Sequence, residues 1–156
     1  MENPLPTERL IFRLMDMLKK QMEKLATVQL AKLISPDFNL TYVPYFMSIG
    51  ETGISNHELL EKIMVTKQGV SKIVKELERL ELIYSVKSKQ DARSIMIYLT
   101  KKGHILNIAI KKMAATTTAE YSNLLGAKKY EQLLDSLVKI QAHNQQLLEK
   151  IGRGTP

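Results

Sequence analysis

The chain contains no cysteine and no tryptophan, and only seven glycines and five prolines occur among its 156 residues. Without cysteine there can be no disulfide, no thiolate metal ligand and no thiol-based redox switch. The scarcity of glycine and proline disfavours folds rich in turns and strands, so we expect a mainly helical fold. No apolar run approaches the roughly 20 residues that a membrane-spanning helix needs. With no recognisable signal peptide at the N-terminus, a cytoplasmic protein is expected.

Positive charge is in excess and is concentrated in one part of the chain. The net charge is +7, from 23 Lys and Arg against 16 Asp and Glu. Residues 62–103 hold ten of these cations and four of these acids. A cationic module indicates a polyanionic partner, and nucleic acid fits best, although such an excess can also serve solubility alone.

The segment 55–103 begins with a predicted helix, turn and helix. Ser55 and Glu58 have the spacing of a capping box, in which each side chain satisfies a backbone N–H of the other. This box opens a short helix. A turn at 64–66 then leads to a second helix, predicted over 67–82.

A two-stranded hairpin is predicted directly after the second helix. Residues 83–87 and 94–99 are short, partly β-branched runs on either side of a polar tip at 88–93. Thr100 is then predicted to cap the next helix, which should run to about Asn123. The order of helix, turn, helix and hairpin is typical of a winged helix–turn–helix that binds DNA.

The second helix of this segment has two chemically different faces at 100° per residue. Hydrogen-bonding and cationic side chains share one face, namely Gln68, Ser71, Lys72, Lys75 and Arg79. Apolar side chains share the opposite face, namely Val70, Ile73, Val74, Leu77 and Leu80. One face is therefore suited to packing and the other to DNA, although ordinary amphipathic helices also have a charged outer face.

Helices with apolar stripes are predicted on both sides of the module. One covers 6–34, and a second starts with Thr41 as its N-cap and Pro44 at its third position. Gly126 separates the last two helices. An apolar seam near heptad spacing in the final helix includes Asn144, which either sets the register of an interface or is simply solvated.

These stripes are too extensive for the small module to cover, so they predict a second copy of the chain in a symmetric homodimer. The expected fold class is mainly α with a small β-hairpin wing. One protomer, 1–156, would hold the winged module at 38–103 between dimerisation helices at 5–34 and 104–151.

Several short runs within 55–103 resemble the DNA-binding module of the MarR (multiple antibiotic resistance regulator) family. The Asp-x-Arg pattern eight residues before Leu-Thr is the most specific of them. The runs are Glu58-Leu59-Leu60, Val65-Thr66, Val70-Ser71-Lys72-Ile73-Val74, Leu77-Glu78, Leu82-Ile83, Asp91-Ala92-Arg93 and Leu99-Thr100-x-x-Gly103.

The resemblance implies a homodimeric transcription regulator that binds a pseudo-palindromic operator and is often released by a small aromatic compound. We expect a repressor. In this interpretation Arg93 enters the minor groove and Asp91 orients the hairpin, while Gln and Lys side chains on the second helix read base edges or contact phosphate. The residues predicted to contact DNA are Ser55, Lys67, Gln68, Ser71, Lys72, Lys75, Lys87, Lys89 and Arg93.

Some positions depart from the pattern of the family. Met64 and Glu81 stand where turn and helix-ending glycines are usual, and a left-handed backbone there costs roughly 1–2 kcal/mol for each. Ser85 replaces a common arginine that would pair with the wing acid, and Ala92 removes a second cation at the tip. The turn and the helix end are therefore expected to differ in shape.

Two other classes of function are alternatives to DNA binding. A winged-helix module for protein contacts is the alternative, because a fold does not fix a function. An enzyme is not expected, because His57, His104 and His143 lie in three separate predicted helices without metal-ligand spacing, and no cofactor or metal is implied.

An effector pocket between the module and the dimerisation helices is a further implication of the resemblance. Met17, Tyr45 and Phe46 are the candidates to line it. The competing interpretation is that all three are ordinary core residues.

Overall fold

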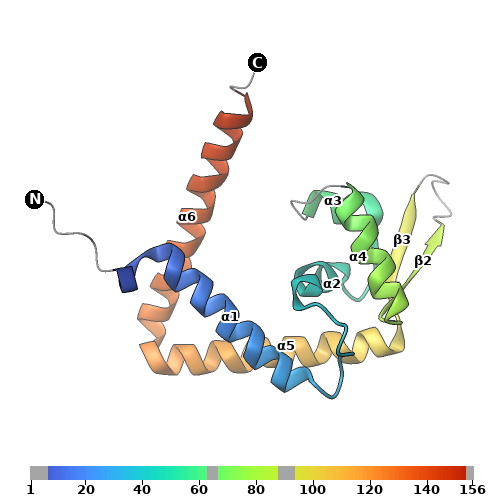
Figure 1. Ribbon diagram of the computed structural model, residues 1–156, viewed down its shortest axis with the longest axis horizontal. Coiled ribbons are helices and arrows are strands. Elements are labelled where there is room, and N and C mark those ends of the chain that lie inside the picture. Colours follow the sequence, from blue (N-terminus) through green and yellow to red (C-terminus); the bar gives the residue numbers. More distant parts are fainter. Residues whose placement is uncertain (1–6, 63–66, 88–93, 154–156) are drawn as a thin grey trace, which may run out of the picture. The chain divides into compact units, whose positions relative to one another are not determined.

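A computed structural model of the chain describes residues 7–62, 67–87 and 94–153 (Figure 1). Within these residues the fold is mainly α with one small sheet, as predicted. The chain divides into two compact units between Met113 and Ala114. The elements are η1 (Thr7–Arg9), α1 (Ile11–Leu30), η2 (Leu40–Tyr42), α2 (Val43–Ile49), β1 (Ile54–Ser55), α3 (Asn56–Lys62), α4 (Lys67–Arg79), β2 (Ile83–Lys87), β3 (Ile95–Leu99), α5 (Lys101–Leu125) and α6 (Ala127–Arg153).

The sheet is antiparallel with the strand order β1-β3-β2. The predicted hairpin is present, with Ile83 paired to Leu99 and Lys87 paired to Ile95. The two-residue strand β1, which the sequence did not predict, adds to the free edge of β3 through the pair Ile54 and Ile97. The sheet therefore joins the start of α3 to the hairpin.

The two faces of the hairpin differ in burial. Ile83, Ile97 and Leu99 point to one face and are buried in the core. On the other face Tyr84 and Tyr98 are direct cross-strand partners whose rings stack, with centroids 5.6 Å apart and planes inclined by 27°. Cross-strand aromatic pairs of this kind stabilise a sheet.

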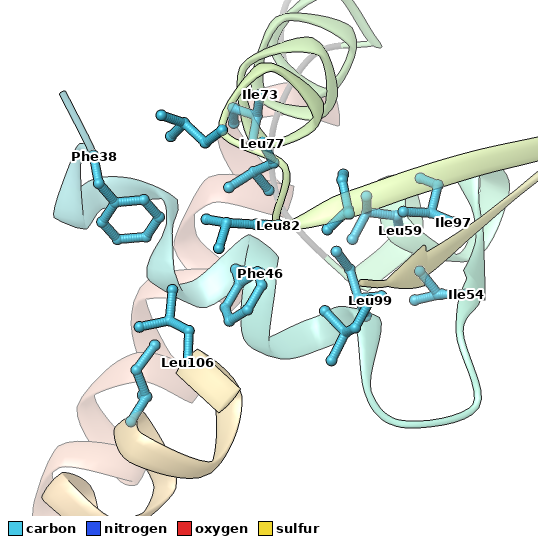
Figure 2. Packing of buried hydrophobic residues seen from close by; sticks show 14 of the residues in the cluster. Phe38, Phe46, Ile54, Leu59, Ile73, Leu77, Leu82, Ile97, Leu99 and Leu106 are labelled. Atoms are coloured by element: carbon cyan, nitrogen blue, oxygen red, sulfur yellow. The ribbon is translucent and has the colours of Figure 1, made fainter. Parts of the chain in front are cut away.

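One continuous hydrophobic core supports the module (Figure 2). The predicted apolar face of α4 lies in it, with Val70, Ile73, Leu77 and Leu80 buried and Val74 packed against the cluster. Buried side chains also come from α2, α3, the sheet and α5. Among them are Phe46, Leu59, Ile97, Leu99 and Leu106. The packing fixes which face of α4 remains outside.

α4 ends at Arg79, three residues before the predicted end. Glu81 has a positive φ of 59°. The Glu81 N–H donates to the Glu78 carbonyl and the Leu82 N–H donates to the Leu77 carbonyl, at 2.8 and 3.0 Å. This is a Schellman motif, which usually places glycine at the left-handed position. The helix end therefore keeps the left-handed shape that glycine usually provides, and the expectation of a different shape is wrong at Glu81.

The start of the second helix also differs from the prediction. Asn39, not Thr41, caps the chain here, since its Oδ1 accepts from the Thr41 N–H at 2.9 Å. A short 3₁₀ turn follows, and α2 begins only at Val43, with Pro44 as its second residue. The prediction of Thr41 as the cap is therefore wrong, although Asn and Thr are both favoured caps.

The ends of α5 agree closely with the predictions, whereas the first helix, predicted over 6–34, is shorter at both ends. The Thr100 Oγ1 accepts from the Gly103 N–H at 3.0 Å and so caps α5. α5 continues to Leu125, and Gly126 breaks the chain with a φ of 84°. The first helix is shorter than expected, since α1 starts at Ile11 after the turn η1.

α1 and α6 each carry large apolar side chains that the protomer leaves exposed. In α1 these include Phe12, Leu25 and Val28. In α6 the predicted seam is exposed, Asn144 included, except for the half-buried Leu137. The seam consists of Leu133, Leu137, Ile140, Asn144, Leu147 and Ile151. Among the described residues, no helix has both the length and the apolar character needed to cross a membrane.

Candidate nucleic-acid interface

The outer face of α4 presents the polar side chains that the sequence placed there. Gln68, Ser71, Lys72 and Lys75 are all exposed, opposite the buried apolar face. Within the described part of the chain, neither lysine ammonium has a carboxylate oxygen within 4.0 Å. Both charges are thus available to an external anion.

Arg79, the last polar residue of that face, has a different environment. Its guanidinium contacts Glu76, with Nη2 2.6 Å from Oε1, and also lies 3.5 Å from Asp37 Oδ2. The hydrogen bond from Arg79 lowers the pKa of Glu76, and the same bond raises the pKa of Arg79. Arg79 therefore links the end of α4 to the loop before η2.

The predicted capping box at the start of α3 is present. The Ser55 Oγ accepts from the Glu58 N–H at 3.1 Å, and a Glu58 carboxylate oxygen accepts from the Ser55 N–H at 2.9 Å and from its hydroxyl at 2.8 Å. Both hydrogen bonds from Ser55 to the carboxylate lower the pKa of Glu58, and the one from the backbone N–H has the larger effect. Because its one hydroxyl proton is used inside the box, Ser55 can offer DNA only its remaining lone pair unless the box opens.

The wing is described only at its base. Lys87 is exposed at the end of β2. The Ser85 hydroxyl donates to Glu78 of α4, so this serine ties the hairpin to the helix. The predicted contacts Lys89 and Arg93, the predicted wing residue Asp91 and the side chain of Lys67 lie outside the described residues.

Three successive carbonyls after α4 are bound by the start of α5. The Leu80 carbonyl accepts from Lys102 Nζ at 2.8 Å, the Glu81 carbonyl from Thr100 Oγ1 at 2.6 Å, and the Leu82 carbonyl from the Thr100 N–H at 3.0 Å. We call these three bonds the α4–α5 junction. Gly103 completes it, because a Cβ there would lie 2.0 Å from the Leu82 oxygen.

No sequence pattern marks Lys102 as a functional residue. Lys102 lies within the motif Leu99-Thr100-x-x-Gly103, but a lysine in the first turn of a helix does not by itself indicate a function. The carbonyl that it binds is 22 residues earlier in the chain. Only the fold brings the two together.

The three candidates for an effector pocket are in different environments. Phe46 is fully buried at 0% exposure, Tyr45 packs against the core, and Met17 is 46% exposed on α1. A groove of about 450 Å³ lies elsewhere on the first unit and includes none of them. It is lined by Lys32, Leu33, Lys101, Lys102, Ile105 and Leu106.

The sequence model of the MarR family matches residues 37–94, from the loop before η2 into the wing. Over these residues the winged module is similar to the MarR family. Proteins of this family are transcription regulators, not enzymes. No curated protein sequence matches the chain.

Solved structures of MarR-family proteins share the fold over most of the chain. The transcriptional regulator SlyA is 20% identical, with a TM-score of 0.74 over 90% of this chain and 98% of its own. The MepR–DNA complex of S. aureus is 22% identical, with a TM-score of 0.70 over 84% of this chain and 95% of its own. FabT of Streptococcus pneumoniae in complex with DNA is 19% identical, with a TM-score of 0.69 over 86% of this chain and 97% of its own. At these identities the likeness establishes the fold.

Proposed function

We propose that this chain is a MarR-family transcription regulator that binds double-stranded DNA sequence-specifically. It acts as a homodimer on a pseudo-palindromic operator and represses transcription. The observation that carries the proposal is the exposed polar face of α4, where Lys72 and Lys75 have no carboxylate partner among the described residues. The MepR and FabT structures, which contain DNA, share this fold and so support the proposal.

The side chains on α4 suit the major groove. An α-helix fits this groove, where a glutamine amide can make two hydrogen bonds to adenine and a lysine can reach guanine or a phosphate. Gln68 and Ser71 are therefore assigned to base edges, and Lys72 and Lys75 to guanine or phosphate. From the wing, Lys87 and Lys89 would contact the backbone and Arg93 the minor groove, with Asp91 orienting the hairpin.

Removing either lysine of α4 should weaken DNA binding. For Lys72→Ala and Lys75→Ala we expect about a tenfold loss of affinity each, and a salt slope smaller by about one if the lost contact is to phosphate. The measurement is fluorescence anisotropy across a salt series, on a duplex selected by the wild-type chain from a random pool and on its scrambled version.

Lys128→Ala is the matched control, because Lys128 is an exposed lysine on α6, outside the winged module. Its affinity should equal that of the wild type. Unchanged binding by both α4 variants would show that α4 is not the reading helix. Failure of the wild-type chain to bind any duplex at low salt would favour the alternative of a module for protein contacts.

The exposed stripes of α1 and α6 support the homodimer. Phe12 is 86% exposed and Ile151 is 68% exposed in the protomer, and each belongs to a row of apolar side chains. Rows of this extent are typical of surfaces that a partner covers. A symmetric dimer would place two copies of α4 about one DNA turn, roughly 34 Å, apart, which matches a pseudo-palindrome.

A charge within the α6 seam should dissociate the dimer. Leu147→Glu is expected to weaken dimerisation by at least about tenfold, because an unpaired carboxylate would be taken out of water. Gln146→Glu adds the same charge at the preceding residue, which is polar and outside the seam, and should leave the dimer intact. Sedimentation velocity distinguishes the two variants, and a monomeric wild-type chain would contradict the homodimer.

Release of the DNA by a small aromatic compound also belongs to the proposal, and it rests on the family resemblance. The expected result is that a small aromatic acid weakens binding to the selected duplex. None of the three residues first assigned to an effector pocket lines the groove near α5, so their role remains a prediction.

A further inference from the structure

We propose that Lys102 is a positioning residue for DNA binding, which holds the end of the DNA-reading helix α4 against the first turn of α5. This inference rests on the proposed function. Its basis is the hydrogen bond of 2.8 Å from Lys102 Nζ to the Leu80 carbonyl, made by a residue that lies outside α4 and its polar face.

The Leu80 carbonyl needs an external donor because of the way in which α4 ends. The carbonyls of Glu76, Leu77 and Glu78 accept from the backbone N–H groups of Leu80, Leu82 and Glu81. The left-handed Glu81 then turns the chain into β2, so the Leu80 carbonyl points out of the helix, and no later backbone N–H among the described residues donates to it. An ammonium is well suited to this place, since it also complements the negative end of the helix dipole.

Thr100 and Gly103 bring the start of α5 close to the end of α4, but the Leu80 carbonyl is bound by Lys102. The two Thr100 bonds hold the carbonyls of Glu81 and Leu82, which belong to the link into β2. Of the three junction bonds, only the one from Lys102 reaches the residue directly after the last residue of α4. Lys102 therefore acts on the orientation of the helix itself.

Besides the core packing of Leu77 and Leu80, two side-chain links hold this end of α4. Glu78 is bound by Ser85 of β2, and Arg79 is paired with Asp37 of the preceding loop. The Arg79–Asp37 pair joins two exposed side chains and is individually weak, and the Ser85–Glu78 bond holds a side chain and not the backbone of the helix. Without the Lys102 bond, the last turn of α4 should open more often and the polar face should lose its fixed alignment.

Misalignment and loss of charge have different effects on DNA binding. Contacts to base edges depend on the helix lying in one orientation, whereas binding to any duplex depends mainly on the number of cations. A positioning residue should therefore affect the selected duplex far more than a scrambled one. A lysine that merely adds positive charge should affect both duplexes equally.

The test compares Lys102→Met with Lys101→Met, which removes the same charge from an exposed neighbour. For Lys102→Met we expect about a tenfold loss of affinity for the selected duplex and less than a twofold loss for the scrambled duplex. Lys101→Met should change neither by more than about twofold, and Lys102→Arg, which can still donate to the Leu80 carbonyl, should restore most of the affinity.

A second measurement does not involve DNA. Amide hydrogen exchange at Leu80, Glu81 and Leu82 reports the last turn of α4, and it should be about tenfold faster in Lys102→Met than in Lys101→Met. This arm also covers the case in which the methionine variant binds no DNA at all.

The outcomes are distinct. Equal losses on both duplexes for the two methionine variants, or unchanged exchange in Lys102→Met, would overturn the positioning role while leaving the proposed function intact. If the wild-type chain enriches no sequence from the random pool, the proposed function fails and the role of Lys102 in DNA binding fails with it.

Discussion

Replacement of Gly103 by alanine is expected to destabilise the first unit by about 3 kcal/mol or more, at the upper end of what overpacking costs. The new Cβ would lie 2.0 Å from the Leu82 oxygen and 3.1 Å from the Leu82 carbonyl carbon. Both are backbone atoms, so no side chain can rotate out of the way. The Thr100 N–H also binds the same oxygen, and moving it would break the α4–α5 junction.

Gly152→Ala is the matched control for this prediction, because Gly152 is also helical and a Cβ there would meet nothing within 4 Å. Alanine is the better helix former, so this variant should be neutral or stabilised by up to about 1 kcal/mol. Urea unfolding of both variants, followed by circular dichroism, makes the comparison. Equal midpoints for Gly103→Ala and the wild type would mean that the junction relaxes without cost.

Phe46→Ala is expected to cost about 3–5 kcal/mol, the usual range for removing a buried phenylalanine. Phe46 is fully buried, and Figure 2 shows its ring within the cluster that also contains Leu82, Leu99 and Leu106. Alanine would leave a cavity where α2 packs against β3, α5 and the link after α4. Phe46→Leu keeps most of the volume and should cost clearly less, about 1 kcal/mol.

The same experiment decides between two interpretations of Phe46. If Phe46 lines an effector pocket, Phe46→Ala should leave the unfolding midpoint nearly unchanged and alter the response of DNA binding to an aromatic acid. If it is a core residue, the midpoint should fall steeply and Tyr45→Ala, at a half-buried neighbour, should have a smaller effect. Thermal unfolding of the three variants at one protein concentration gives the answer.

The parts of the fold that the sequence predicted are those with strong local signals. The two faces of α4, the capping box at Ser55, the hairpin and the break at Gly126 each follow from a repeat, a spacing or a residue type. Local rules failed where two signals competed. Asn39 and Thr41 both suit a cap, and the end of α4 lacks the glycine that usually marks it.

Other features depend on contacts between distant residues and could not be predicted from one sequence. The strand β1 is only two residues long, and the sequence assigns its serine to the capping box and to DNA contact, not to a strand. Arg79 has the periodicity of a DNA-facing residue, yet Asp37, far away in sequence, pairs with it. Lys102 lies between two motif positions, but its role depends on the Leu80 carbonyl, which lies between α4 and β2.

The stacked pair of Tyr84 and Tyr98 gives the chain a built-in optical reporter. Because there is no tryptophan, the near-ultraviolet signal comes from six tyrosines and three phenylalanines, with the tyrosines dominant. Two of those tyrosines are held at a fixed angle as cross-strand partners on the hairpin. Near-ultraviolet dichroism depends on such fixed packing, so the protein carries an intrinsic chromophore that registers whether β2 and β3 remain paired, without any attached dye.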